Sequence, residues 1–284
     1  MMISHTYHAV PLQAKRISRI TGQVVALVKV ELLMQWRRRG FWLAFAGATI
    51  IFILLTGMNL SIQVSTYLTK VSSQEAAHFI IFTRFSFFTG LSGFVAGLLV
   101  VDRIVRDQRL GLADIQQATS LHTVCYVLGK FCGNCLAVMV PCVLSFLLFL
   151  SVYLVAGVTV GILLPCLLAL CVVLLPACLL IVAFVLFFAS LVPLRMAQIG
   201  FPLLWIWAIL APLGWPSIAT TILSPTGYFA VGYWFYTSGV ADSSQQFTLT
   251  NAIANLVAVP TLALLLLLLL ALVLEILARI SACA

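Results

Sequence analysis

The sequence predicts an all-α integral membrane protein with six transmembrane helices, an N-terminal amphipathic interfacial helix and a re-entrant external segment before the last span. Hydrophobic residues make up 63% of the 284 residues and charged residues 8%, whereas soluble domains carry roughly a quarter charged residues. The apolar residues form runs of about 20, the length that a helix needs to cross a bilayer. These runs do not alternate with polar residues as barrel strands do, so helices are the expected spanning element.

The N-terminal region combines a polar tail with a two-faced helix. Residues 1–15 form the tail, and residues 16–284 form a single transmembrane domain. Between residues 16 and 38, apolar residues recur at three- and four-residue spacing, which predicts a helix lying on the membrane surface. Its apolar positions are Ile17, Ile20, Val24, Leu27 and Val28.

Six apolar runs define the predicted spans. The first run follows Trp36 and the cations Arg37 to Arg39, an aromatic and basic boundary typical of the headgroup level. The fourth run is overlong, and Pro176 near its middle predicts a kink. The predicted spans cover approximately residues 41–60, 79–101, 131–155, 160–191, 196–213 and 252–274.

Residues 102–130 form the longest polar interruption between two spans, with seven charges in 29 residues. Opposite charges stand four residues apart in two pairs, Asp102 with Arg106 and Arg103 with Asp107. This spacing lets the charges pair on a helix, so the second span is expected to continue as a helix into the loop. Gly111 then breaks this helix, and a short amphipathic helix follows. Because a simple connector could be far shorter, this loop is expected to do more than join two spans.

Residues 214–251 contain many aromatic residues and are broken by proline and glycine. They have no Lys or Arg, and Asp242 is their single charged residue. The segment is too interrupted to span and too aromatic for an ordinary solvated loop, so it predicts re-entrant or interfacial helices on the external side.

The distribution of Lys and Arg predicts the orientation. With six spans and an internal N-terminus, 13 of the 15 basic residues lie on the cytoplasmic side, and Lys70 and Arg84 lie near the outer face. The positive-inside rule therefore predicts a multi-pass protein of the cell membrane with both termini in the cytoplasm. Since the basic residues lie in short patches beside the spans, the formal charge of +8 indicates topology and membrane lipid rather than nucleic acid.

The second predicted span contains three residues of interest. Arg84 lies near the end of the span, where its side chain is expected to reach the headgroups; a role in a substrate pathway is the alternative. Gly93 and Gly97 form a G-x-x-x-G pair, which permits close packing of membrane helices.

This layout resembles the permease subunits of ABC-2 type ATP-binding cassette transporters. The resemblance covers essentially the whole chain, and its most similar pieces are RDQRLG at residues 106–111 and YVLGK at residues 126–130. It implies a coupling helix within loop 102–130 that docks on a separate ATPase subunit, a connecting helix at residues 16–38, and an external re-entrant segment at residues 214–251. It also implies an exporter in which the permease forms a homodimer or heterodimer.

The resemblance assigns residues to these roles. For the ATPase-docking surface it implies Arg106, Asp107, Arg109, Gly111, Leu112 and Ile115. For the connecting helix it implies Arg19, Glu31 and Arg37, with Glu31 as an ionic partner of the docking surface. ATP and magnesium would bind the partner, since this chain has no G-x-x-x-x-G-K-[ST] motif and is expected to bind no cofactor itself.

Other classes of function remain open. A membrane-embedded enzyme or assembly factor could use Arg84 or the cysteines Cys125, Cys132, Cys135 and Cys142, although cysteine on a packed helix is usually a small apolar residue. No zinc-type second ligand pair or hydrolase motif is present, so neither a metal site nor catalysis is expected. A secondary transporter is a further alternative, but no Asp or Glu lies well inside a span.

Overall fold

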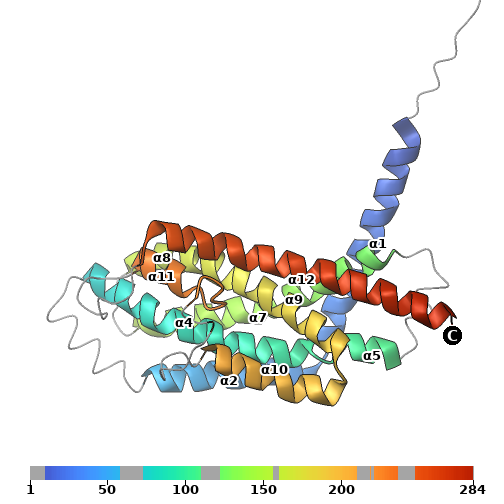
Figure 1. The fold of residues 1–284 in the computed structure, drawn as a ribbon. Coiled ribbons are helices and arrows are strands. Elements are labelled where there is room, and N and C mark those ends of the chain that lie inside the picture. Colours follow the sequence, from blue (N-terminus) through green and yellow to red (C-terminus); the bar gives the residue numbers. More distant parts are fainter. Residues whose placement is uncertain are drawn as a thin grey trace, which may run out of the picture.

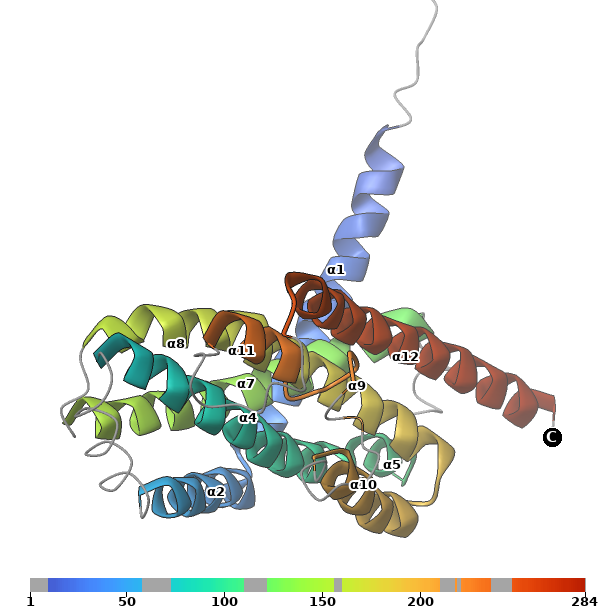
Figure 2. The ribbon, with the colours of Figure 1, turned by 60° about the vertical axis from the view of Figure 1, so that its left-hand side comes forward.

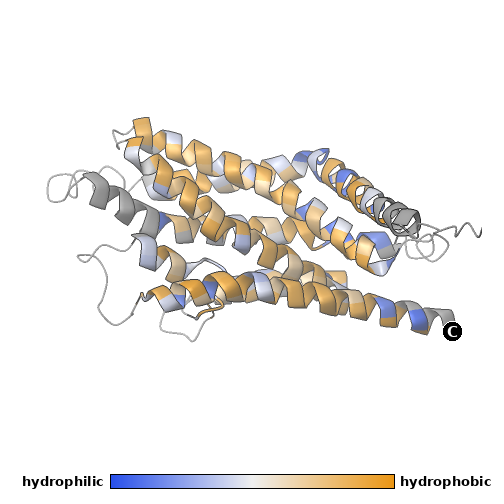
Figure 3. Cartoon of the chain, turned by 90° about the horizontal axis from the view of Figure 1, so that it is seen from above, coloured by the Kyte–Doolittle hydropathy of each residue, from blue (hydrophilic) through white to orange (hydrophobic). Residues whose placement is uncertain are grey.

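The computed structural model describes residues 10–57, 73–109, 122–155, 160–209, 218, 221–235 and 247–283, and all regular structure within these ranges is helical (Figure 1). Four segments of the described chain are long and apolar enough to cross a membrane: Arg39–Thr56, Thr123–Val152, Leu163–Leu191 and Leu249–Leu277. The chain is therefore a helical membrane protein. Figure 3 shows hydrophobic residues along most of the length of these helices and hydrophilic residues gathered near their ends.

The predicted second and fifth spans are represented by shorter apolar helices. Phe87–Val100 is the apolar part of α4 (Ser73–Val100), and the whole of α10 (Leu194–Ile209) is apolar. The predicted end of the fifth span, at residue 213, falls within residues 210–217, which lie outside the described ranges. Within the described chain, four segments rather than six are therefore long and apolar enough to cross a membrane.

The N-terminal helix α1 (Val10–Trp36) leaves the bundle at its N-terminal end, and its C-terminal half packs along α7 (Thr123–Val155) (Figures 1 and 2). A short turn then leads into α2 (Arg39–Gly57), which packs against α4 and α7. The third predicted span lies within α7, which begins at Thr123, eight residues before residue 131. In these additional turns, Gly129 packs closely on Leu27 of α1 and Lys130 pairs with Glu31 of α1.

The fourth predicted span is interrupted where expected, although not by a simple kink. The short 3₁₀ turn η1 (Val160–Ile162) leads into α8 (Leu163–Ala169), then a π-helical turn η2 (Leu170–Leu174), then α9 (Leu175–Leu191). Pro176 lies in the first turn of α9. Proline lacks an N–H and clashes with the carbonyl four residues earlier, and the widened π turn relieves both problems.

Helix α9 lies at the centre of the bundle and contacts α4, α7, α10 and α12 (Leu249–Cys283). The glycine pair of α4 faces α10. A Cβ atom on Gly97 would lie within 3 Å of the Phe201 ring, and one on Gly93 would lie 2.6 Å from both Trp205 and Ile181. These two glycines therefore allow large aromatic side chains to pack directly on the α4 backbone.

Only parts of the predicted external segment are described. Residues 221–227 form turns that lead into α11 (Tyr228–Phe235), which packs against α12 and α4. Gly227 has a φ of 67° and packs so closely on Val173 of the π turn that a Cβ atom would lie 2.4 Å from a Val173 methyl. Only glycine fits both the backbone conformation and this contact.

Candidate functional site

The most polar buried region of the described chain lies where α1, α7 and α5 (Arg103–Arg109) meet, at the end of the bundle opposite α11 (Figure 1). Two glycines of α7 bring α1 close. A Cβ atom on Gly129 would lie 2.6 Å from Leu27, and one on Gly133 would lie 2.7 Å from Glu31 Cβ. This spacing of four residues leaves a groove on α7 that the α1 helix fills.

Lys130 occupies the centre of this region and is 4% exposed. Its Nζ lies 2.6 Å from Asp107 Oδ2 of α5 and 3.3 Å from Glu31 Oε2 of α1. The ammonium therefore joins carboxylates from two different helices, and each carboxylate is itself buried. Within the described residues this arrangement replaces the expected pairing of Asp107 with Arg103, and Glu31 contacts α7 and α5 rather than an exposed docking surface.

Neutral side chains complete the hydrogen bonding around Lys130. Tyr126 donates its hydroxyl to Asp107 Oδ2 at 2.7 Å, and Asn134 donates to Glu31 Oε1 at 3.1 Å. Gln35 of α1, which is fully buried, donates to Asn134 Oδ1 at 2.7 Å. Tyr126, Lys130 and Asn134 recur every four residues, so α7 presents one continuous polar stripe to its neighbours.

A second group of charges lies at the turn between α4 and α5. Both terminal guanidinium nitrogens of Arg38 donate to Asp102 Oδ2 at 3.1 Å, in a half-buried pair. Asp102 thus pairs with Arg38 rather than with Arg106 in the described structure. Arg103 is 1% exposed, and its Nε lies 3.7 Å from both Glu31 Oε1 and Asp102 Oδ1.

Arg103 is the least satisfied member of this region. None of its guanidinium nitrogens has a hydrogen-bond partner among the described residues. Burial lowers the pKa of Arg103 below its ordinary value, and the Glu31 carboxylate opposes this shift. The guanidinium thus lies between a carboxylate of α1 and one of the α4–α5 turn and forms a close hydrogen-bonded pair with neither.

We define the charge network as the residues of these two groups. Its acids are Glu31, Asp102 and Asp107, and its bases are Arg38, Arg103 and Lys130. The formal charges cancel, which burial in a low-dielectric region requires. Removing one partner from such a buried pair typically costs about 3–5 kcal/mol because a charge is left uncompensated. The charge network therefore fixes the relative positions of α1, α5 and α7.

The other residues predicted for function lie elsewhere or are only partly described. Arg106 on α5 and Arg37 after α1 are exposed, whereas Arg84 is half-buried in α4. Arg19 and Arg109 belong to α1 and α5, but their side chains are outside the described set. Gly111, Leu112 and Ile115 fall within residues 110–121, which are not described.

Sequence reasoning missed the role of Lys130 in the charge network and its neutral neighbours Asn134 and Gln35. The available signal was the combination of the polar stripe on α7 with Gly129 and Gly133 inside an otherwise apolar helix. Small residues beside regularly spaced polar ones indicate a helix face that packs on another helix instead of on lipid.

The cysteines do not form a site in the described structure. Seven of them are free thiols, and five of these are buried on packed helix faces of the spans. No group of three or more metal-binding side chains occurs among the residues that the structure describes. The cysteines of α7 therefore contribute to packing.

Comparison with known proteins gives no further assignment. No family model matches this sequence, and no curated protein sequence matches it significantly.

Proposed function

We propose that this chain is the transmembrane permease subunit of an ATP-binding cassette exporter. It would cross the cell membrane six times, with α4 and α10 forming the second and fifth spans and residues 214–251 forming the re-entrant external segment. Both termini would lie in the cytoplasm. The chain would dimerise with a copy of itself or with a related permease and form the substrate pathway within the lipid bilayer.

The observation that carries this proposal is the charge network. It joins the start of the 102–130 loop to the N-terminal helix and to α7 through the contacts of Lys130 with Asp107 and Glu31. A solvated connector would not need a buried, three-helix ionic attachment. A loop that receives force from a partner would need one, because the force must reach the spans rather than bend the loop.

The mechanism follows from this attachment. ATP binding would close a pair of ATPase subunits and displace the coupling helix that the sequence predicts within loop 102–130. Through Asp107 and Lys130, α5 would carry α7 and α1 with it as a rigid unit, in a two-state change of inward and outward access. Arg103 would exchange between Glu31 and Asp102 as the turn shifts. ATP and magnesium would act on the partner, and this chain would supply only the mechanical response.

The docking surface would include the exposed Arg106, together with Arg109, Gly111, Leu112 and Ile115. Asp107 is buried against Lys130, so we assign it to the transmission of force instead of to docking. Arg37 would lie at the membrane surface beside this site.

Co-purification tests the proposal. The chain is expressed with the ATP-binding cassette protein encoded nearest to it, and the amount of ATPase retained is measured. We expect Arg106→Glu combined with Leu112→Asp to abolish retention. The control is Arg279→Glu, which reverses an exposed cation of α12 and should retain the ATPase. An ATPase that never binds, or that binds both variants equally, would exclude the assignment.

A further inference from the structure

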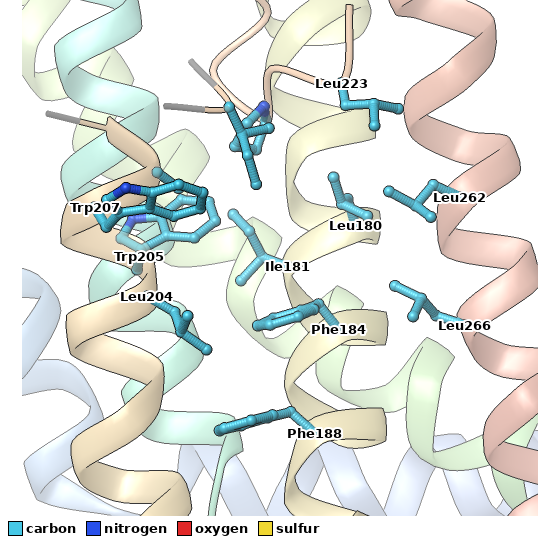
Figure 4. A pocket seen from close by; sticks show the side chains of 13 residues that line it. Leu180, Ile181, Phe184, Phe188, Leu204, Trp205, Trp207, Leu223, Leu262 and Leu266 are labelled. Atoms are coloured by element: carbon cyan, nitrogen blue, oxygen red, sulfur yellow. The ribbon is translucent and has the colours of Figure 1, made fainter. Parts of the chain in front are cut away.

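An apolar slot of about 390 Å³ lies between α9, α10 and α12 (Figure 4). Side chains of α9 lie between the tryptophans of α10 on one side and the leucines Leu262 and Leu266 of α12 on the other. Leu223 closes the end that lies toward the buried turn before α11. The slot shares no lining residue with the charge network.

The slot runs along the axis of a spanning helix. Leu180, Phe184 and Phe188 line it at intervals of four residues, which corresponds to a length of about 12 Å. The volume of about 390 Å³ is therefore spread along the helix axis. A narrow, elongated occupant that lies parallel to α9 fits this shape.

The lining offers no polar anchor. Among the residues that the structure describes, the lining contains no charged, hydroxyl or amide side chain, and its polar side-chain atoms are the two indole N–H groups. The N–H of Trp205 is already committed, since it donates to Gly90 O at 2.9 Å. An occupant must therefore be a hydrocarbon.

The surroundings of the slot give access from the bilayer. Leu204 and Trp207 line the slot and are 41% and 43% exposed, and their neighbours Leu203 on α10 and Leu265 on α12 are more exposed still. These leucines continue the lipid-facing surface of two long apolar helices up to the edge of the slot. An acyl chain lying along the bilayer normal can enter sideways without crossing a polar layer.

We propose that this slot binds one acyl chain of a membrane lipid. The bound chain would lie along α9 between Trp205 and Leu266, with its headgroup left at the membrane surface. This inference does not depend on the proposed function, because it requires neither an ATPase nor transport.

Trp205 provides the test, because it lines the slot yet is only 6% exposed. The full-length chain, with its other five tryptophans replaced by phenylalanine, is reconstituted into vesicles of phosphatidylcholine brominated along one acyl chain. Bromine quenches tryptophan on contact. We expect Trp205 to lose most of its emission, and Ala208→Phe, which fills the slot, to restore it.

Two controls make each outcome decisive. A variant that keeps only the exposed Trp207 must be quenched, which shows that brominated lipid reaches α10. Leu203→Phe adds a ring to the lipid-facing side of α10 and should leave the quenching of Trp205 unchanged. If Trp207 is quenched and Trp205 is not, the slot holds no lipid. The proposal is also wrong if the quenching of Trp205 persists in Ala208→Phe. It is likewise wrong if this quenching disappears when the protein-to-lipid ratio is raised, because a second copy then covers the slot.

Discussion

The two ends of the bundle bury polar groups in opposite ways. At one end, the charge network holds three acids and three bases between α1, α5 and α7. At the other end, the turn at residues 222–227 holds only neutral groups. Asn255 donates to the carbonyls of Ile222 and Ser224 at 2.6 and 3.2 Å, and the Ser224 and Thr226 hydroxyls bond each other at 2.9 Å.

The difference indicates which end can move. The neutral turn is fixed by short hydrogen bonds and by the contact of Gly227 with Val173, so it has one favourable arrangement. The charge network leaves the Arg103 guanidinium and Asp102 Oδ1 without hydrogen bonds in the described structure. Arg103 Nε lies 3.7 Å from Asp102 Oδ1 and 3.7 Å from Glu31 Oε1, just beyond hydrogen-bond distance of both. We infer that both ends hold their helices together, and that Arg103 is the group of the charged end whose pairing can change.

The largest effect is expected at Lys130. Lys130→Met leaves Asp107 and Glu31 buried without their shared cation, so the free energy of unfolding should fall by about 3–5 kcal/mol. Thermal unfolding of the purified protein in detergent measures this loss. The matched control is Arg279→Met, which breaks the exposed pair with Glu275 and should change stability by less than about 1 kcal/mol. Equal effects of the two substitutions would contradict the buried network.

The contact of α1 with α7 should be the next most sensitive. Gly133→Leu places a side chain where Glu31 Cβ now lies, and overpacking of this kind costs about 1–3 kcal/mol. Gly47→Leu is the control, because a Cβ atom on Gly47 meets nothing within 4 Å. Limited proteolysis after α1 and thermal unfolding should both distinguish the two variants. Similar behaviour of both would show that α1 does not pack closely on α7.

The neutral end should respond to Asn255→Leu by a similar amount. The carbonyls of Ile222 and Ser224 then lose their donor, and each buried unsatisfied group costs about 1–3 kcal/mol. Because the turn and the charge network share no partners, the effects of Asn255→Leu and Lys130→Met should add within about 0.5 kcal/mol. A larger interaction energy would mean that the two ends are coupled even without ATP.

The smallest effect is expected at Arg38. Its pair with Asp102 is partly exposed, so Arg38→Ala should cost less than about 1 kcal/mol. The same thermal unfolding measurement checks this value. A cost similar to that of Lys130→Met would show that the two groups of charges form one inseparable unit.

The sequence predicted the helical class and the break near Pro176 because both follow from local composition. Long apolar runs identify helices that can span, and proline disrupts the hydrogen bond of the preceding turn wherever it occurs. The six-span count and the orientation stay predictions. The third span was predicted from about residue 131, whereas α7 begins at Thr123, because its first turns, which include Lys130, pack against α1 and α5.

The candidate site was predicted only in outline. The loop that contains Asp107 and the helix that contains Glu31 were both identified as important, but Asp107 was paired with Arg103, four residues away, and Glu31 with the docking surface of the loop. In the structure, Lys130 pairs with Asp107, which is 23 positions away in the sequence, and with Glu31, which is 99 positions away. Contacts at this separation depend on how helices pack, and spacing along one helix does not contain that information.

The central proposal is that Lys130 transmits force between the proposed partner ATPase and the spans. The test measures ATP hydrolysis in vesicles that contain the chain and the ATP-binding cassette protein retained in co-purification. The wild type, Lys130→Arg and Lys130→Met are compared, with each signal normalised to the amount of folded complex. We predict that Lys130→Met still binds the ATPase but loses the stimulation of hydrolysis that the wild-type chain gives, and that Lys130→Arg, which keeps the charge, restores most of it. Full stimulation in the folded Lys130→Met complex would contradict the claim.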